Sequence, residues 1–350
     1  MRHFEYSSAT TVDETIQLLS QQHSNIVANG QGNHGQASGQ NGNGETSQIK
    51  ALAGGTDLLT LMKADIVTPT QLVDIKRLDE IPRGIDHQPQ GTTIGALTTL
   101  ADIELNESIQ QRYPLLTQAA ASAATPQLRN MATIGGNLMQ RPRCWYFRHA
   151  HFHCWLKGGD ECHARDGENQ LHAIFDASPC VATHPSDLAS ALVAVDAEVR
   201  LRGPAGERNV TLEQFFTLPS DNHRRETELA PDELIMSIHI PNHATTTRSV
   251  YLKAMDRKVW AFALVGVAAR LDMQGDQVVD ARLVLSGVAP VPWRLRAVEQ
   301  MIVGQPLDDA RIAQVAEAAV NNAQPLQHNG YKVPLAASLI RRALTELTQN

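Results

Sequence analysis

The chain has 350 residues, of which 42% are hydrophobic and 19% are charged, so it can bury a sizeable core and is not globally disordered. Its 30 basic and 37 acidic residues give a formal net charge of −7, which offers no overall electrostatic reason to bind nucleic acid or an anionic membrane. No apolar run approaches the roughly 18 residues of a membrane span, and residues 1–19 lack an apolar signal-peptide region, so we expect a soluble protein without a leader of its own.

The N-terminal region is predicted to form a strand and then an amphipathic helix, since Val12, Ile16 and Leu19 recur at roughly helical spacing, with Thr11 or Asp13 as the capping residue. Residues 22–48 follow, and they consist almost entirely of Gly, Asn, Gln, Ser and His. Because so few apolar side chains cannot repay the entropy of ordering, we interpret residues 22–48 as a surface loop.

The rest of the chain mixes strands and helices without a regular βαβ repeat, which favours an α+β fold. Strands are predicted over residues 72–75, 92–96, 197–202 and 234–240, and helices over residues 99–106, 113–124 and 186–194. A linker at residues 241–247 precedes strands near 251, at 263–271 and at 278–286, and helices from 295, from 308 and at 335–347. The predicted domains are therefore residues 1–241 and 247–350.

Two glycine pairs are candidates for anion binding. Gly54 and Gly55 lie between an apolar strand and a helix, and adjacent glycines allow successive backbone N–H groups to converge on an anion near the positive end of the helix. Gly135 and Gly136 repeat this device after Thr133. The first segment matches neither a dinucleotide fingerprint nor a P-loop, and a simple capped strand–helix turn is its alternative interpretation.

The four cysteines are Cys144, Cys154, Cys162 and Cys180, and they fall within about a tenth of the chain. Their separations of 10, 8 and 18 positions contain no C-x-x-C pair, which lowers the case for structural zinc, and they differ from the compact ferredoxin pattern. Residue chemistry and spacing alone leave zinc, an iron–sulfur cluster and two disulfides as alternatives.

Several motifs resemble, in order, those of the FAD-binding subunits of molybdenum hydroxylases, the xanthine dehydrogenase and carbon monoxide dehydrogenase group. They are Ala-Gly-Gly-Thr-Asp-Leu at 53–58, Ile-Gly-Ala at 94–96, Ala-Thr-Ile-Gly-Gly-Asn at 132–137, Ser-Asp-Leu-Ala at 186–189, Tyr-Leu-Lys at 251–253, Gly-Val-Ala-Pro at 287–290 and Asn-Gly-Tyr-Lys-Val at 329–333. The resemblance implies a two-part FAD-binding domain of the vanillyl-alcohol-oxidase/p-cresol-methylhydroxylase type, followed by a C-terminal α+β domain of the CO dehydrogenase flavoprotein type.

The resemblance also implies which residues bind FAD. The pyrophosphate would lie on the first glycine segment, which is Lys50, Ala51, Leu52, Ala53, Gly54, Gly55, Thr56 and Asp57. The second segment, Thr133, Gly135, Gly136 and Asn137, would close over the phosphates and ribityl chain. Asp187 would lie near the adenosine, and Ile235 and Lys253 would contact the cofactor, although a core strand residue and an exposed lysine are the alternatives for these last two. Residues 52–57 contain no His or Cys, so we expect the FAD to be non-covalent.

The cysteines lie in an insertion at residues 141–183 that resembles an insertion in the corresponding subunits of bacterial periplasmic aldehyde oxidoreductases and of 4-hydroxybenzoyl-CoA reductase. There, four cysteines bind a 4Fe–4S cluster, so the resemblance implies that Cys144, Cys154, Cys162 and Cys180 do the same. The insertion is expected to contain few apolar residues, so that the cluster would hold it together.

The resemblance implies an electron-transfer subunit of a three-subunit aldehyde oxidoreductase, inactive on aldehydes alone. Its partners would be a large molybdopterin-binding subunit, a small subunit with two 2Fe–2S clusters and an external electron acceptor. The compartment would be the periplasm, reached on a partner's leader, or otherwise the cytoplasm. The alternatives are the equivalent subunit of a 4-hydroxybenzoyl-CoA reductase-like enzyme or another molybdenum hydroxylase, and a non-enzymatic, zinc-binding assembly module. No nucleophile–base pair for catalysis is predicted.

Overall fold

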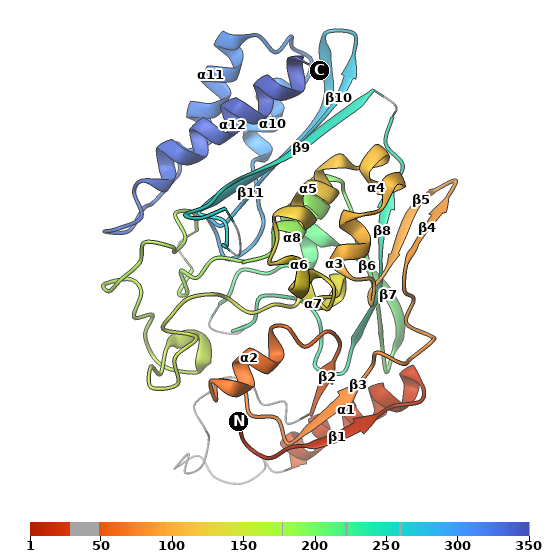
Figure 1. Ribbon diagram of the computed structural model, residues 1–350. Helices are drawn as coiled ribbons and strands as arrows, with labels where there is room; N and C mark the ends of the chain where they lie inside the picture. The colour runs from red at the N-terminus through yellow and green to blue at the C-terminus, as the bar shows by residue number, and fades with distance from the viewer. Residues whose placement is uncertain (29–48, 177, 221–222, 245, 259–260, 350) are drawn as a thin grey trace.

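A computed structural model describes residues 1–28, 49–176, 178–220, 223–244, 246–258 and 261–349 (Figure 1). The N-terminal part forms a small parallel sheet in the order β1-β3-β2. Its elements are β1 (Glu5–Ser8), α1 (Val12–Ala28), β2 (Ile49–Leu52), α2 (Leu58–Lys63) and β3 (Gln71–Asp74).

The first helix is longer than expected. The predicted loop begins at Gln22, but α1 continues to Ala28. No glycine or proline interrupts residues 22–28, and the first glycine of the range is Gly30, so a helix already nucleated can propagate through the polar residues. The remainder of the predicted loop, residues 29–48, lies outside the described residues.

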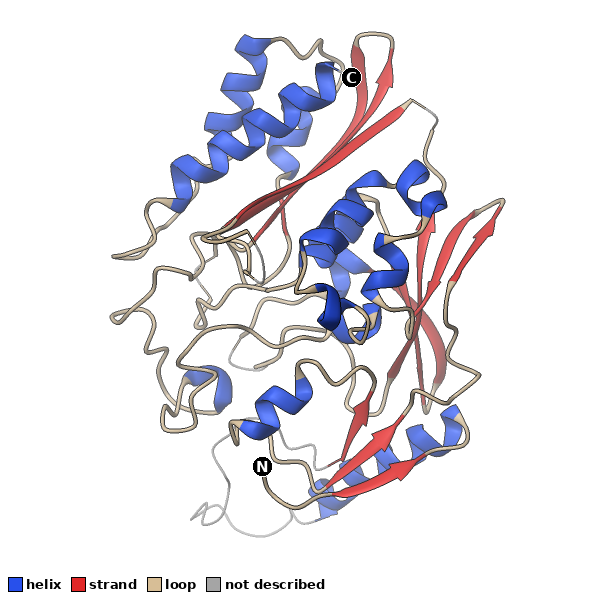
Figure 2. Ribbon diagram, viewed as in Figure 1, coloured by secondary structure: helices blue, strands red, loops and turns tan. Residues whose placement is uncertain are grey.

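The second part of the chain is a five-stranded antiparallel sheet in the order β4-β5-β8-β6-β7 with helices beside it (Figure 2). Alternate residues of β6 are buried, as the two-residue period of a strand requires. The elements are β4 (Ile85–Gln88), β5 (Gly91–Gly95), α3 (Leu100–Glu104), α4 (Glu107–Arg112), α5 (Pro114–Ser122), α6 (Pro126–Arg129), α7 (Ile134–Leu138), α8 (Asp187–Ala194), β6 (Glu198–Gly203), β7 (Gly206–Thr211), α9 (Leu212–Phe215) and β8 (Leu234–Pro241).

The C-terminal part is a four-stranded antiparallel sheet in the order β12-β11-β10-β9. Its elements are β9 (Thr247–Ala254), β10 (Val265–Gln274), β11 (Gln277–Ser286), β12 (Trp293–Arg294), α10 (Arg296–Ile302), α11 (Asp309–Ala318) and α12 (Lys332–Gln349). Helix α12 begins three residues before the predicted start, because Pro334 is tolerated in the first turn of a helix.

Both faces of this C-terminal sheet are covered (Figures 1 and 2). Helices α10 and α12 pack on one face, and α5 and α8 pack on the other. Along β10, Val267 and Ala269 belong to the core under the C-terminal helices, whereas Ala268 between them belongs to the core shared with α5 and α8. The strands and helices therefore form an α+β arrangement, as expected, and α5 and α8 join the C-terminal sheet to the core of the second part.

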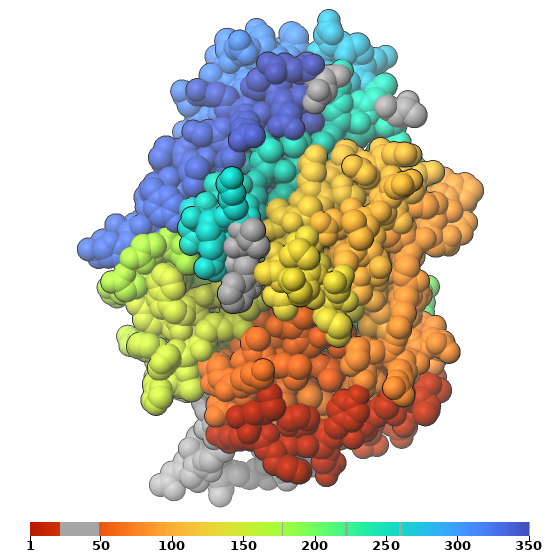
Figure 3. Space-filling view, viewed as in Figure 1, coloured from red at the N-terminus to blue at the C-terminus, as the bar shows by residue number. Residues whose placement is uncertain are grey.

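The insertion at residues 141–183 has little regular structure apart from one 3₁₀ turn, η1 (Trp155–Lys157). Its surface lies between the segment around α2 and the C-terminal helices (Figure 3). The expectation that it contains few apolar residues is wrong, because Phe147, Trp155, Leu156, Ile174 and Phe175 are all buried. Its packing therefore contributes to holding it in place.

Polar anchors fix the end of the insertion to the C-terminal domain. The Asn329 side chain donates hydrogen bonds to the carbonyl oxygens of His172 (3.1 Å) and Ala173 (3.0 Å). The fully buried Lys332 ammonium donates to the carbonyl oxygens of Leu171 (2.9 Å) and Gly287 (2.7 Å). The Asn-Gly-Tyr-Lys-Val motif thus serves as a docking point for the insertion. No described helix is long and apolar enough to cross a membrane.

Candidate functional site

A cavity of about 470 Å³ brings together segments from all parts of the chain. This volume is in the range of small-molecule and cofactor sites. The predicted site residues Thr56, Asn137, Asp187 and Cys144 all line it. Other residues around it include Gln140, Arg143, Trp145, His172, Thr183, His184, Asp256, Phe262, Ser286 and Gly287. The two glycine segments, the α8 N-terminus and the insertion therefore contribute to one site.

The first glycine segment has the geometry of an anion-binding turn. Gly55 has a φ of +70°, in the left-handed region that favours glycine. The lack of a side chain at Gly54 lets the backbone of Met131 lie close to the turn, because a Cβ atom there would lie 1.9 Å from the carbonyl oxygen of Met131. Among the described residues, nothing accepts a hydrogen bond from the backbone N–H groups of Gly54, Gly55 or Thr56. These donors fit the phosphate oxygens of a dinucleotide cofactor.

The residues just before this turn are part of the sheet. Lys50, Ala51 and Leu52 belong to β2 and pair with β3, and Ala53 follows directly. The Leu52 side chain is buried in a small apolar cluster. Burial lowers the pKa of Lys50 to about 8. The strand thus positions the turn.

The Asp57 carboxylate binds the insertion. Its Oδ1 atom pairs with Arg143 (2.7 Å) and Arg148 (2.8 Å), and its Oδ2 atom accepts a hydrogen bond from the backbone N–H of Arg141 (2.9 Å). Burial lowers the pKa of Arg143 to about 10, while Asp57 opposes that shift. Asp57, predicted from the sequence as a cofactor contact, therefore joins the glycine turn to the start of the insertion.

The second glycine segment does not repeat the anion-binding device. Gly135 and Gly136 lie inside the short helix α7, with Thr133 as its N-cap. Their N–H groups donate to the carbonyl oxygen of Ala96 (3.0 Å) and to the Thr133 hydroxyl (3.2 Å), so they are already used within the protein. The prediction of a second N–H cradle is therefore wrong. Asn137 still lines the cavity, where its Oδ1 atom accepts a hydrogen bond from the Ser186 hydroxyl (2.5 Å).

Asp187 and Lys253, both predicted site residues, form a buried ion pair of 2.8 Å with side chains only 4% and 2% exposed. The alternative of an exposed lysine is thus wrong. Tyr251 donates a hydrogen bond to the other Asp187 oxygen (2.6 Å) and contacts the Ser286 hydroxyl (2.9 Å). Burial and the neighbouring Asp187 raise the pKa of Tyr251 well above its usual value.

Tyr251 and Ser286 were not predicted from the sequence. Tyr251 lies two residues before Lys253 on β9, so the two-residue period of a strand places both on one face and could have indicated it. Gly266 on β10 leaves room for them, since a Cβ atom there would lie 2.2 Å from the Ser286 hydroxyl and 2.6 Å from the Tyr251 hydroxyl. Ile235 lies on β8 and is buried in the main core, which matches the alternative interpretation as a core strand residue.

The four cysteines lie together in the insertion as free thiols, so the disulfide alternative is wrong. All four belong to one apolar cluster with Phe147, Trp155 and Leu156. Burial raises the pKa of Cys144 to about 12, whereas a hydrogen bond with Cys180 lowers that of Cys162 to about 6. No group of three or more His, Cys, Asp or Glu in the described part of the chain has its side chains already converged for a metal ion. The donor set, four thiols, fits an iron–sulfur cluster chemically.

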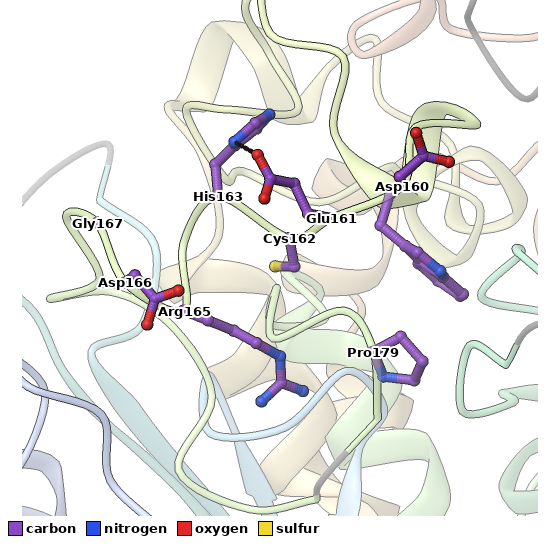
Figure 4. A pocket seen from close by; sticks show the side chains of 9 residues that line it. Asp160, Glu161, Cys162, His163, Arg165, Asp166, Gly167 and Pro179 are labelled. Carbon is purple, nitrogen blue, oxygen red and sulfur yellow. Dashed lines mark ion pairs between the residues drawn. The ribbon is translucent and has the colours of Figure 1, made fainter.

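Cys162 also lines an open surface hollow of about 610 Å³ (Figure 4). Around it lie Trp155, Asp160, Glu161, His163, Arg165, Asp166 and Pro179, with an ion pair of 3.2 Å between His163 and Glu161. Because Cys144 lines the cavity and Cys162 lines this hollow, the cysteine cluster reaches from the cavity to the surface.

Two histidines of the cavity wall, His172 and His184, are nearly inaccessible to solvent. Burial lowers the pKa of His172 to about 4, with a further contribution from Lys332, and lowers the pKa of His184 to about 3. Both rings are therefore neutral at pH 7, although an unfolded chain protonates them below a pH of about 6.5.

Acid should destabilise the fold through these two rings. Below a pH of about 6.5 the unfolded chain binds protons that the folded chain excludes, so the free energy of unfolding falls by about 1.4 kcal/mol per pH unit and histidine. This loss ends where the folded pKa values are reached, about 4 for His172 and about 3 for His184. Between pH 7 and pH 5, the midpoint of thermal unfolding should fall less for His184→Phe than for the wild type. An equal fall of the midpoint in both proteins would contradict the conclusion that acid destabilises the fold through His184.

Comparison with known proteins identifies the family. The model for the FAD binding domain in molybdopterin dehydrogenase matches residues 2–243, and the model for the CO dehydrogenase flavoprotein C-terminal domain matches residues 250–347. The aldehyde oxidoreductase FAD-binding subunit PaoB of Escherichia coli (strain K12) is 37% identical over 308 residues, covering 85% of this chain and 91% of that relative. The carbon monoxide dehydrogenase medium chain of Hydrogenophaga pseudoflava is 29% identical and covers 97% and 96%.

Solved structures agree with this result. Carbon monoxide dehydrogenase from Hydrogenophaga pseudoflava matches with a TM-score of 0.73 at 28% identity, covering 98% of this chain and 96% of that chain. Quinoline 2-oxidoreductase from Pseudomonas putida 86 shares the fold, with a TM-score of 0.71 at 21% identity and coverage of 100% and 99%. The two matched domains and the relatives' assignments confirm the expected fold, FAD binding and a role in oxidoreduction. The chain belongs to the FAD-binding medium subunits of the molybdenum hydroxylase family.

Proposed function

We propose that this chain is the FAD- and 4Fe–4S-binding electron-transfer subunit of a molybdenum-dependent aldehyde oxidoreductase with three subunits. Its partners would be a large molybdopterin-binding subunit, on which aldehydes are oxidised, and a small subunit with two 2Fe–2S clusters. Bound FAD supplies the exchange of single electrons with clusters and of electron pairs with an external acceptor. The 37% identity to an aldehyde oxidoreductase FAD-binding subunit supports the aldehyde class over the alternatives.

The observation that carries this proposal is the position of the cysteine cluster. Cys144 lines the same cavity as Thr56, Asn137 and Asp187, while Cys162 lines the open hollow at the surface. A subunit that passes electrons between a flavin and other carriers needs its redox groups near one another and near the surface. Cys144 at the cavity and Cys162 at the hollow have positions that fit these two needs.

The residues of the chain have separate tasks in this proposal. The N–H groups of Gly54, Gly55 and Thr56 bind the phosphates of a non-covalent FAD, in a segment where residues 52–57 include no His or Cys for attachment. Asp187, which pairs with Lys253, offers a carboxylate acceptor for hydroxyl or amino donors of the adenosine. Cys144, Cys154, Cys162 and Cys180 bind the cluster as thiolates. Export to the periplasm on a partner's leader completes the proposal, and a twin-arginine leader in the large subunit would support it.

Cofactor analysis of the purified chain and of its complex tests the proposal. Denaturation and filtration should release the flavin, and anaerobically purified chain should contain about four iron and four sulfide. Cys162→Ser should lower the iron content while FAD remains. The complex should reduce a dye with aldehyde, whereas the isolated chain should not, because the proposal places aldehyde oxidation on the large molybdopterin-binding subunit. Stoichiometric zinc without iron, or aldehyde turnover by the chain alone, would reject the assignment.

A further inference from the structure

The cavity wall contains two buried histidines without hydrogen-bond partners. His172 is 2% exposed and His184 is 4% exposed, and both line the cavity. Among the described residues, neither ring nitrogen of either side chain has a hydrogen-bond partner. Buried polar groups in folded proteins are nearly always paired, so two imidazoles with unpaired nitrogens in the wall of one cavity point to a partner supplied by its occupant.

The surrounding structure fixes the two rings in place. The His184 ring packs against Phe216 with their centroids 4.6 Å apart, and its backbone N–H donates to the carbonyl oxygen of Ala289 (2.9 Å). The His172 ring packs edge-on against Trp145 at 5.2 Å, and its carbonyl oxygen accepts a hydrogen bond from Asn329 (3.1 Å). Packing and backbone contacts therefore account for the positions of the rings but leave their nitrogens unused.

The chemistry of these nitrogens selects one class of ligand group. A neutral imidazole presents one N–H donor and one acceptor nitrogen. The phosphates of FAD are acceptors only and have donors at the first glycine segment, whereas the isoalloxazine and adenine rings both carry donors and acceptors along their edges. We propose that His172 and His184 bind the polar edge of a heteroaromatic ring of FAD. The inference depends on FAD binding by the family and not on the proposed cluster or the aldehyde substrate.

Phenylalanine substitutions test this proposal, because they keep a planar ring and remove both nitrogens. His172→Phe and His184→Phe should each raise the Kd for FAD roughly 3- to 10-fold, as expected for one lost neutral hydrogen bond. The matched control is His151→Phe, which changes an exposed histidine of the same insertion and should leave the Kd unchanged. The Kd is measured by fluorescence quenching as FAD is added to the FAD-depleted chain.

Two further readouts distinguish ligand binding from a structural role and identify the ring. Thermal unfolding of the FAD-depleted variants should match or exceed that of the wild type, because the substitutions remove unpaired buried nitrogens. A changed visible spectrum of bound flavin would place the histidines at the isoalloxazine, and weaker competition by ADP would place them at the adenine. Unchanged FAD and ADP affinities would overturn the proposal and assign the nitrogens to water. His184→Asn keeps a side chain that can donate and accept hydrogen bonds. If the phenylalanine variants unfolded at a lower midpoint than the wild type without FAD, and His184→Asn did not restore FAD affinity, the proposal would also be overturned.

Discussion

Gly54→Ala is expected to abolish FAD binding, because the added Cβ atom has no space. It would lie 1.9 Å from the carbonyl oxygen of Met131 and 2.9 Å from its carbonyl carbon, both backbone atoms. The backbone N–H of the neighbouring Ala132 donates a hydrogen bond to Leu128 (2.8 Å), and its carbonyl oxygen accepts one from Leu100 (2.9 Å). These hydrogen bonds hold the Met131–Ala132 backbone in place. The glycine turn must therefore move, and its N–H groups lose their arrangement around the phosphates.

The ratio of flavin to protein after purification, together with thermal unfolding, measures this effect. Overpacking of this kind typically costs about 1–3 kcal/mol of stability. Gly55→Ala should have a smaller effect on FAD binding, since the Cβ atom would meet only leucine side chains, at 3.1 and 3.2 Å, although the φ of +70° strains an alanine by about 1–2 kcal/mol. Gly330→Ala is the control, because nothing lies within 4 Å of its Cβ position. Stoichiometric FAD in Gly54→Ala would contradict the role of the close approach.

Local sequence signals predicted many of the elements. The helices predicted over residues 99–106 and 186–194 correspond to α3 and α8, and the structure shows that the Thr99 and Ser186 side chains cap them by accepting hydrogen bonds from backbone N–H groups. The strands β4 and β7 were not predicted, because one or both of their faces are solvated: β7 contains Glu207, Arg208 and Asn209 in succession. These edge strands are specified by pairing with their neighbours rather than by their own hydrophobic pattern.

In the candidate site, too, local features could be predicted from the sequence, whereas contacts between distant segments could not. The first glycine segment was predicted because two adjacent glycines carry their conformational meaning locally, and the cysteines because they are close in sequence. The contacts of Asp57 with Arg143 and Arg148 join residues more than 80 positions apart, so no local pattern could indicate them. The glycines of α7 were misinterpreted because Gly-Gly alone does not distinguish an open turn from close packing. Here a Cβ atom added to Gly135 would lie 3.1 Å from the carbonyl oxygen of Ala96.

The buried pair of Asp187 and Lys253 should be among the most sensitive positions for stability. Asp187→Ala leaves the Lys253 ammonium, which is 2% exposed, with the carbonyl oxygen of Ser122 as its one remaining hydrogen-bond partner among the described residues. Removing one member of a buried ion pair costs about 3–5 kcal/mol. Asp13→Ala is the matched control, because it breaks an ion pair with Arg202 in which the aspartate is 77% exposed, and such pairs contribute about 0–1 kcal/mol.

The double variant Asp187→Leu/Lys253→Met separates stability from cofactor binding. Replacing both members of a buried pair with apolar residues of similar size is often neutral or stabilising, and Ser286 remains as a partner for the Tyr251 hydroxyl. The double variant should therefore unfold near the wild-type midpoint. It should nevertheless bind FAD at least about 10-fold more weakly, since a carboxylate that accepts hydrogen bonds from the adenosine is a charged partner. Wild-type FAD affinity in the folded double variant would show that the pair only supports the cavity wall and that the predicted cofactor contact of Asp187 is wrong.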